Sequence, residues 1–138
     1  MVFQIPRDAS LELVRELFSR DRFAVESCGC EILEAAEGHA VCALELADRH
    51  LNANDLPMGG AIFTLADFCL GIASNYNQVA SVTTSSTIDY LSVAGTRRLI
   101  ARANADKMGK TLGFFTVEVH DSNDLLVARM TAICTRVG

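Results

Sequence analysis

The sequence has little proline and no run of basic residues, and both absences restrict what the protein can be. Of its 138 residues only two are Pro, 50% are hydrophobic and 21% are charged. This composition is typical of a globular chain and excludes an intrinsically disordered one. The formal net charge is −5. Without a cluster of Lys or Arg, such a chain is not expected to bind nucleic acid or an anionic membrane surface.

Long hydrophobic runs are also missing. The longest mostly apolar stretch, Ala61–Ala73, is too short to span a bilayer and contains Asp67. The N-terminal sequence MVFQIPRDAS has no basic segment followed by an apolar one, so it predicts no signal peptide. We therefore expect no membrane partner.

The cysteines do not form a disulfide pattern. Their number, five, is odd, and the chain is not Cys-dense. Cys28 and Cys30 are the only close pair, and no further His or Cys pair completes a four-ligand zinc site. We expect reduced thiols, no metal, and a cytoplasmic location.

The chain is organised as one domain, residues 1–138, because its length suits a single core and no repeat or linker interrupts it. Apolar residues at helical spacing predict a helix over Asp8–Ser19. Phe23–Ala36 reads as a strand, interrupted near Gly29, and Ala40–Ala47 as the strand that returns from it. These two strands are predicted to form a hairpin.

The centre of the chain contains a loop, His50–Gly60, and then the strongest predicted helix, Ala61–Asn75, which is apolar almost all round. A pattern of period two then predicts four strands, over Val79–Leu91, Arg97–Lys107, Leu112–Asp121 and Leu125–Arg136. The fold class expected is α+β. An antiparallel sheet of about six strands would wrap round the long helix, with a short helix at the N-terminus.

Gly59 and Gly60 stand where the long helix is predicted to begin. The first turn of a helix has unpaired N–H groups and the positive end of the helix dipole. Without side chains there, a ligand oxygen could approach these donors, as in an oxyanion hole. The alternative interpretation is that the glycines only permit a tight turn and close helix packing.

Asp67 lies within the apolar helix, seven residues after Gly60 and therefore on the same face. A buried carboxylate is costly unless it is paired or functional, so Asp67 is a candidate base or nucleophile. Alternatively, it pairs with an Arg or a backbone N–H at a subunit interface. Backbone donors and a carboxylate on one face suit acyl transfer or hydrolysis. The sequence has no G-x-S-x-G motif, which favours a water-based or carboxylate-based mechanism.

The segment from Asn52 to Asp67 resembles the hotdog-fold acyl-CoA thioesterases, in particular the phenylacetate-pathway (PaaI-type) branch. Members typically have an Asn, then His-Gly-Gly, then an Asp; here these positions are Asn52, Met58-Gly59-Gly60 and Asp67. The TLAD sequence of the helix and the strand Thr87–Leu91 are similar too. The resemblance extends from about Val25 onward.

The resemblance implies a role for each matching position. Asp67 would act as general base or nucleophile, and the backbone N–H of Gly60 would polarise the thioester carbonyl. Asn52 would position water or the thioester. Thr83 would assist the water, with its neighbour Thr84 as the weaker choice. The family's active sites lie at a dimer interface, so Asp67 and Gly60 would come from different subunits of a homotetramer, a dimer of dimers.

The His of the family motif is Met58 here. A backbone oxyanion donor survives this change, so Met58 either fills an apolar acyl pocket or marks a weakened catalyst. Leu56, Phe63 and Phe68 would contribute to the same pocket. The sequence does not identify the acyl group.

Other residues would bind the remainder of the substrate. In the family, positions near Arg97, Arg98, Lys107 and Lys110 contact the CoA phosphates, and here they are alternatively solvated hairpin residues. The stretch Gly109–Gly113, which includes Thr111, resembles one that runs beside the pantetheine arm.

The three His residues, His39, His50 and His120, are expected at the surface. The predicted function is hydrolysis of an acyl-CoA thioester without a cofactor. Two alternatives stay open: a non-catalytic acyl-CoA binder or sensor, which Met58 would permit, and a hotdog hydratase or dehydratase, which usually needs a His that this motif lacks.

Overall fold

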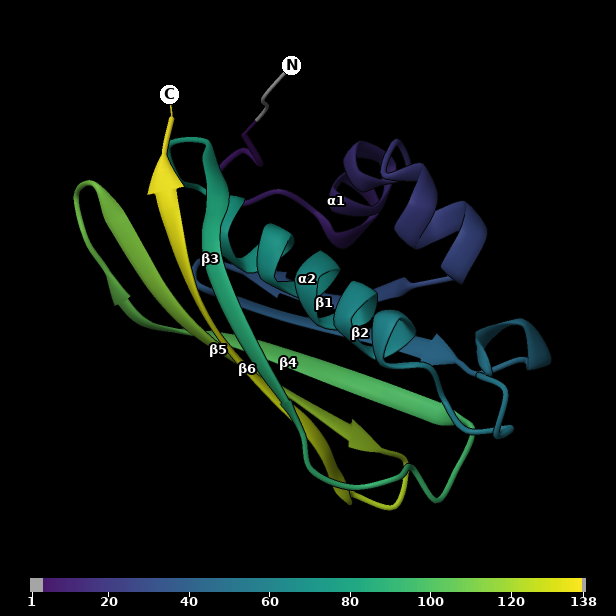
Figure 1. The fold of residues 1–138 in the computed structure, drawn as a ribbon. Coiled ribbons are helices and arrows are strands. Elements are labelled where there is room, and N and C mark those ends of the chain that lie inside the picture. Colours follow the sequence, from purple (N-terminus) through teal and green to yellow (C-terminus); the bar gives the residue numbers. More distant parts are fainter. Residues whose placement is uncertain (1–3, 138) are drawn as a thin grey trace.

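The computed structural model describes residues 4–137. Met1–Phe3, which open the stretch searched for a signal peptide, and Gly138 lie outside the described residues. A single antiparallel sheet curves round one long helix, α2 (Gly59–Asn75), in the strand order β1-β2-β4-β5-β6-β3 (Figure 1). The strands are β1 (Glu31–Ala36), β2 (His39–Glu45), β3 (Ser81–Tyr90), β4 (Arg98–Met108), β5 (Leu112–Asp121) and β6 (Leu126–Arg136).

The core lies between α2 and the concave face of the sheet. Leu65, Cys69 and Ile72 point inward from α2 and are fully buried. Burying a Leu or Ile side chain contributes about 1.5–3 kcal/mol. The Cys69 thiol lies close enough to donate to the carbonyls of Ala40 on β2 and Ala101 on β4. The helix therefore packs directly on the middle of the sheet, which explains its apolar sequence.

Irregular register lets the sheet bend round the helix. The pairing shifts at one position in β1, in β3, in β4 and near the end of β5. Such bulges increase local bend and twist. The β3 shift lies between Thr83 and Ser85, on the edge strand that passes beside α2 in Figure 1.

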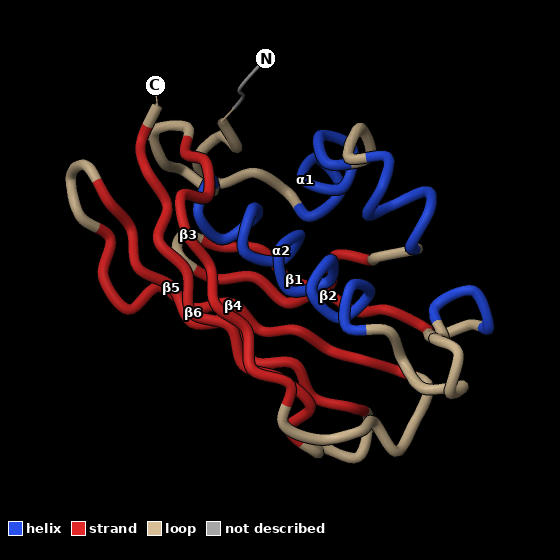
Figure 2. Tube along the Cα trace, viewed as in Figure 1, coloured by secondary structure: helices blue, strands red, loops and turns tan. Residues whose placement is uncertain are grey.

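The N-terminal part of the chain covers one flank of α2. Helix α1 (Leu11–Phe18) is capped by Ser10, whose hydroxyl accepts from the N–H of Leu13. After it comes η1 (Phe23–Cys28), a short π-helix drawn in blue beside α1 in Figure 2. The prediction of a strand throughout Phe23–Ala36 is therefore wrong in its first half. The chain turns at Gly29, in a left-handed conformation, before β1 begins.

The other predicted elements are present with small changes of boundary. The predicted hairpin is β1–β2, and the four later strands are β3 to β6. The loop before α2 contains one turn of 3-10 helix, η2 (Asp48–His50). No helix within residues 4–137 is long and apolar enough to cross a membrane.

Candidate active site

The N-terminus of α2 has backbone donors that the described part of the chain does not use. Met58 is the N-cap and makes no side-chain cap. Its carbonyl accepts from the N–H groups of Ala61 and Ile62. Within the described residues the N–H groups of Gly59 and Gly60 have no acceptor. A Cβ added at Gly60 would meet nothing within 4 Å, so an external acceptor can reach this position.

Gly59 is in a different environment from Gly60. The Tyr90 hydroxyl donates to the Gly59 carbonyl at 3.0 Å, and the Tyr90 ring lies 3.1 Å from where a Cβ at Gly59 would be. The end of β3 therefore holds the start of α2. Sequence reasoning did not identify Tyr90, although it stands in the strand that supported the family resemblance.

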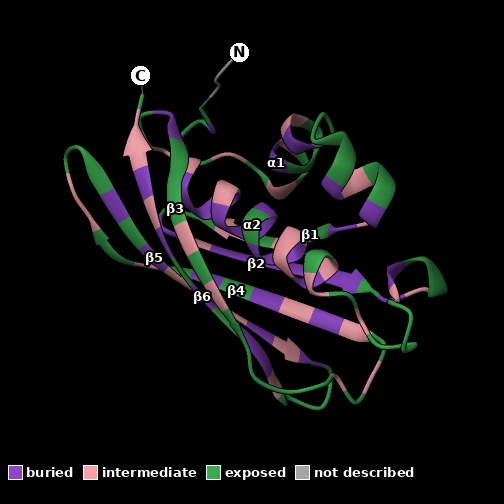
Figure 3. Ribbon diagram, in the orientation of Figure 1, coloured by how far each residue is buried: buried purple, intermediate pink, exposed green. Residues whose placement is uncertain are grey.

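Asp67 lies on the one side of α2 that the chain leaves open. Gly60 and Asp67 are exposed, and Phe63, Thr64 and Gly71 on the same side are only partly covered. Figure 3 shows green and pink segments, exposed and partly covered, along α2 between its buried ones. The expectation that α2 is buried on most sides holds for the rest of the helix. The sequence of α2 stays apolar even along this open stripe, because partly covered apolar residues suit contact with a second molecule.

The pKa of Asp67 is raised from its ordinary value. The larger cause is loss of water around the carboxylate, and the smaller is the negative charge of Asp21. Asp21 lies between α1 and η1, outside the motif, and only the tertiary fold brings it near Asp67. A raised pKa suits a general base, because a more basic carboxylate accepts a proton from water more readily.

Asn52 organises the loop that precedes α2. Its amide oxygen accepts from the N–H groups of Asn54 and Leu56, and its backbone N–H donates to the Leu56 carbonyl. The side-chain oxygen is therefore occupied. The side-chain NH₂ donates to no acceptor within residues 4–137 and is the atom available to a substrate or water.

A cavity of about 400 Å³ opens beside the start of α2. Asn52, Leu56, Gly59 and Tyr90 are among its lining residues, together with the segment 91–94. A second hollow of about 260 Å³ shares Leu56 and continues to Arg97. The apolar character of these walls suits an acyl or pantetheine chain.

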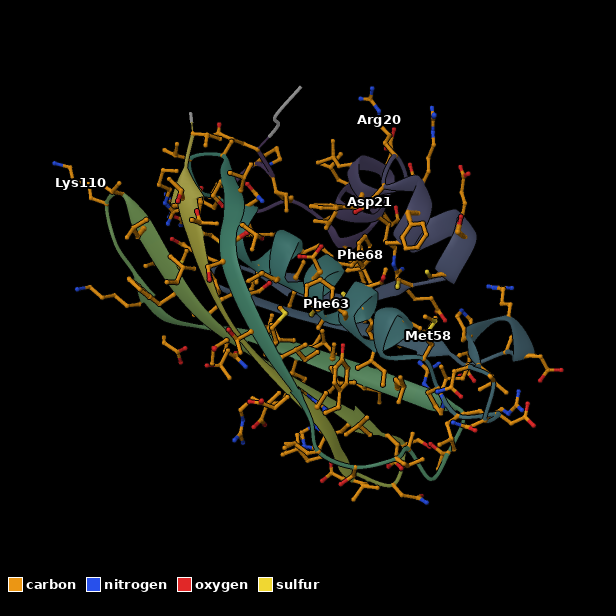
Figure 4. The ribbon with its side chains drawn as sticks, in the orientation of Figure 1. Arg20, Asp21, Met58, Phe63, Phe68 and Lys110 are labelled. Carbon is orange, nitrogen blue, oxygen red and sulfur yellow. The ribbon has the colours of Figure 1, made fainter. Side chains whose placement is uncertain are left out.

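The residues predicted to line one acyl pocket lie in three different places (Figure 4). Met58 is 56% exposed at the beginning of α2. Phe63 is half-buried on the open stripe. Phe68 is buried, packs edge-on against Phe18 with ring centroids 5.9 Å apart, and lines a separate cavity with Cys30. Within one chain, only Leu56 of the predicted set lines the cavity beside Gly59.

The two neighbouring threonines Thr83 and Thr84 of β3 differ in their surroundings. Thr83 pairs with Cys134 of β6. Burial raises the pKa of the Cys134 thiol; its hydrogen bond with Thr83 counteracts this, and the charge of Asp67 adds a small increase. Thr83 is thus linked through Cys134 to the side of the molecule that carries Asp67. Thr84 instead shares a hydrogen bond with Thr135.

The predicted phosphate-binding residues are far apart within one chain. Arg97 precedes β4, where it pairs with Asp48 at 3.2 Å. Lys110 and Thr111 are exposed in the hairpin after β4. Figure 4 shows Lys110 at the opposite end of the molecule from Met58. One CoA nucleotide cannot contact both groups in a single chain, because β4 extends for roughly 35 Å between them.

His50 is buried, which corrects the expectation that all three His residues lie at the surface. It is only 5% exposed, and its ring hydrogen-bonds to the backbone of Ala47 and Cys28. Both ring nitrogens are occupied by these bonds, so neither is free to act as the His partner that a hydratase would need. His39 and His120 are partly exposed.

The five cysteines are free and buried. Burial and the neighbouring Cys28 raise the pKa of Cys30 to about 12. Burial also raises the pKa of Cys134, and a hydrogen bond from Cys69 together with burial raises that of Cys42, so Cys30, Cys42 and Cys134 are poor nucleophiles at neutral pH. Within residues 4–137 no group of three or more His, Cys, Asp or Glu side chains is arranged to hold a metal ion.

Comparison with known proteins gives a consistent family. Residues 58–128 match the model of the thioesterase superfamily. The acyl-coenzyme A thioesterase PaaI of Escherichia coli is 30% identical over 115 residues, covering 82% of this chain and 81% of that protein.

Two solved structures extend this likeness. The E. coli PaaI protein from the phenylacetic acid degradation operon superposes with a TM-score of 0.80 at 27% identity, over 94% of this chain and 97% of that one. A Streptococcus mutans protein bound to acetyl-CoA superposes with a TM-score of 0.75 at 27% identity, over 79% and 89%. The chain therefore belongs to the thioesterase superfamily, as a hotdog-fold member of the PaaI type.

Proposed function

We propose that the protein hydrolyses an acyl-CoA thioester to the free acid and CoA. One observation carries this proposal. The open stripe of α2 presents both free N–H groups at the helix N-terminus and the carboxylate of Asp67, whose pKa is raised. The similarity to an acyl-CoA thioesterase and to an acetyl-CoA-bound protein supports the substrate class.

In the proposed mechanism the Gly60 N–H, with that of Gly59 beside it, donates to the thioester carbonyl oxygen as negative charge develops on it. Asp67 takes a proton from water, and the water oxygen attacks the carbonyl carbon. The C–S bond then breaks, and the CoA sulfur receives the proton. Preorganised backbone donors of this kind typically contribute 10²–10³ in rate.

Asp67 can alternatively attack the carbonyl itself, forming a mixed anhydride that water then cleaves. The two routes differ in where the water oxygen goes. In a single turnover in H₂¹⁸O, attack by water at the substrate carbonyl labels the acid product. Hydrolysis of the anhydride at the Asp67 carbonyl would instead label the protein.

We infer that a second copy of the chain completes the site. Gly60 and Asp67 are two turns apart on α2, which is about 10 Å along the helix axis. A single carbonyl group must lie about 3 Å from both the donor and the base, so the two residues of one chain are too far apart. A two-fold axis would bring Asp67 of one copy to Gly60 of the other.

The edge of the sheet supports this dimer. Among residues 4–137, β3 pairs only with β6, and most of its residues are exposed, including Val82 and Tyr90. A long exposed edge strand presents free backbone groups that suit pairing with another strand. Association of two such dimers would give the proposed homotetramer, in which Arg97 and Lys110 of different chains can serve one CoA.

The proposal is tested with a panel of acyl-CoAs: acetyl, butyryl, hexanoyl, octanoyl, palmitoyl, phenylacetyl and hydroxybenzoyl. Free CoA is followed by HPLC, because the protein's own thiols would react with a thiol dye. We expect turnover of at least one member, unchanged by EDTA. Binding without turnover of any member would contradict hydrolysis and favour the acyl-CoA binder. Analytical ultracentrifugation of the same sample tests the tetramer.

A further inference from the structure

We propose that His50 is a positioning residue that holds the loop 51–58 so that the N–H groups of Gly59 and Gly60 stay directed toward the open stripe. This inference rests on the proposed function for its catalytic meaning. Its structural part can be tested independently of that function.

Both ring nitrogens of His50 are used. Nδ1 accepts from the Ala47 N–H at 2.8 Å, and Nε2 lies 2.7 Å from the Cys28 carbonyl oxygen. An N–H faces Nδ1 and a carbonyl faces Nε2, so both bonds require the neutral ring with its proton on Nε2. The buried ring thus joins the end of η1 to the start of η2.

The backbone of His50 continues this connection to the candidate site. The His50 carbonyl accepts from the Met58 N–H at 2.9 Å. Met58 is the N-cap of α2, and its own carbonyl accepts from the third and fourth residues of the helix region, Ala61 and Ile62. One direct series of hydrogen bonds therefore leads from the imidazole residue to the first turn of α2.

The loop between His50 and Met58 is closed on itself. Leu51 and Pro57 form a β-bridge, and Asn52 makes four hydrogen bonds within the turn. These bonds brace the loop internally, so its orientation depends on what holds its base. His50 holds one side of that base, while Tyr90 holds the other through the Gly59 carbonyl.

The N-terminus of α2 makes this anchoring important. Most helices fix their first turn with a Ser, Thr, Asp or Asn side chain. Met58 provides no such bond. A capping side chain would also occupy the donors that a thioester needs. The position of the free N–H groups is therefore set from outside the helix, and an error of about 1 Å in such a position can cost 10²-fold in rate.

The test compares three variants of His50 that remove different ring bonds. His50→Phe removes both, His50→Asn can keep the acceptor for Ala47, and His50→Gln can keep the donor to Cys28. His39→Asn is the matched control, because His39 is partly exposed and bonds only to the side chains of Asn104 and Glu34.

We expect His50→Phe to lower kcat at least tenfold with KM changed less than threefold, and His50→Asn or His50→Gln to recover part of the loss. The ¹H–¹⁵N resonances of Gly59 and Gly60 should shift in the same order and stay unchanged in the control. Folded His50 variants with wild-type kcat and unshifted Gly59 and Gly60 resonances would overturn the proposal. So would a lower Tm as the only effect.

The wild-type protein gives a measurement that does not depend on variants folding. Long-range ¹H–¹⁵N spectra should show His50 as the neutral ring protonated at Nε2. Protonation at Nδ1, or on both nitrogens at pH 7, would overturn the proposal. If the wild type hydrolyses no acyl-CoA, the proposed function fails, while the amide resonances still decide whether His50 positions the α2 N-terminus.

Discussion

Tyr90 and Gly59 fit together so closely that neither could be enlarged without moving the other. The Tyr90 hydroxyl donates to the Gly59 carbonyl, and its ring occupies the space beside the glycine Cα. Gly60, the next residue, faces open space. The two glycines of the motif therefore serve different purposes: one admits a neighbouring side chain of the same chain, and the other leaves room for a molecule from outside.

Replacing each glycine by alanine tests the two purposes separately. Gly60→Ala should keep or raise Tm, because Ala is favoured over Gly in a helix by about 1 kcal/mol and its Cβ meets nothing in the chain. It should lower kcat/KM at least tenfold by crowding the substrate. Gly59→Ala should lower Tm, because its Cβ would lie 3.1 Å from the Tyr90 ring. Thermal melts and the CoA-release assay measure both. Full activity in Gly60→Ala would contradict the close approach of the thioester to this position.

Asp67→Asn should stabilise the protein at neutral pH. The folded state raises the pKa of Asp67 above its ordinary value of 3.8, so the ionised form carries a cost of folding. That cost is fully present above the folded pKa and absent below the ordinary value. Tm of the variant should therefore exceed that of the wild type at pH 7, with the difference vanishing toward about pH 4. A lower Tm at pH 7 would show that the carboxylate is paired.

Asp21→Asn should move the pH dependence of the reaction. The negative charge of Asp21 raises the pKa of Asp67, so its removal lowers that pKa. The rising limb of kcat/KM, which requires ionised Asp67, should shift to lower pH. Glu16→Gln removes an exposed charge of the same sign from α1 and should leave the limb in place. If the rising limb of the pH profile does not move in Asp21→Asn, the charge of Asp21 does not act on Asp67.

The ionised carboxylate of Asp121 should stabilise the folded protein, whereas that of Asp67 destabilises it. The N–H groups of Gly95, Leu125 and Asn123 all donate to its carboxylate, and the bond from Gly95 is the largest cause of its lowered pKa. The stabilisation is present above the ordinary value of 3.8 and is lost as the pH falls through the lower folded value. Asp121→Asn should therefore lower Tm at pH 7.

The difference in Tm between Asp121→Asn and the wild type should narrow in acid. Melts at pH 7, 5, 4 and 3 measure it. Asp124→Asn provides the control, since Asp124 has a φ of 66°, a conformation that Asn tolerates. A difference that stays constant over this range would exclude the carboxylate charge as its cause.

Periodicity in the sequence predicts most of this fold. The alternation of Leu112–Asp121 matches β5 at both ends, and the start of α2 lies only two residues before the predicted Ala61. Phe23–Cys28 forms a helix where a strand is predicted, because a short segment with several apolar residues is as compatible with a strand as with a short helix. The left-handed Gly29 is the local signal that separates the two elements.

Only some residues of the candidate site could likewise be predicted from the sequence. The sequence alone could place Gly60 and Asp67 on one face of α2, because helical geometry fixes which face each residue occupies. Asp21, Tyr90 and the buried ring of His50 could not, because each reaches the site through contacts between elements distant in the chain. A signal for His50 was present: it stands at the third position of η2, where a side chain can reach back to the N-cap, here Ala47.

The most direct test of the account is the turnover of Asp67→Asn on the best acyl-CoA of the panel. The variant retains the size of the side chain but can neither take a proton from water nor attack a carbonyl. We expect kcat to fall by 10²–10⁴, with the oligomer unchanged by ultracentrifugation and Asp124→Asn as active as the wild type. Hydrolysis by Asp67→Asn at the wild-type rate would contradict the central claim that this carboxylate drives the reaction.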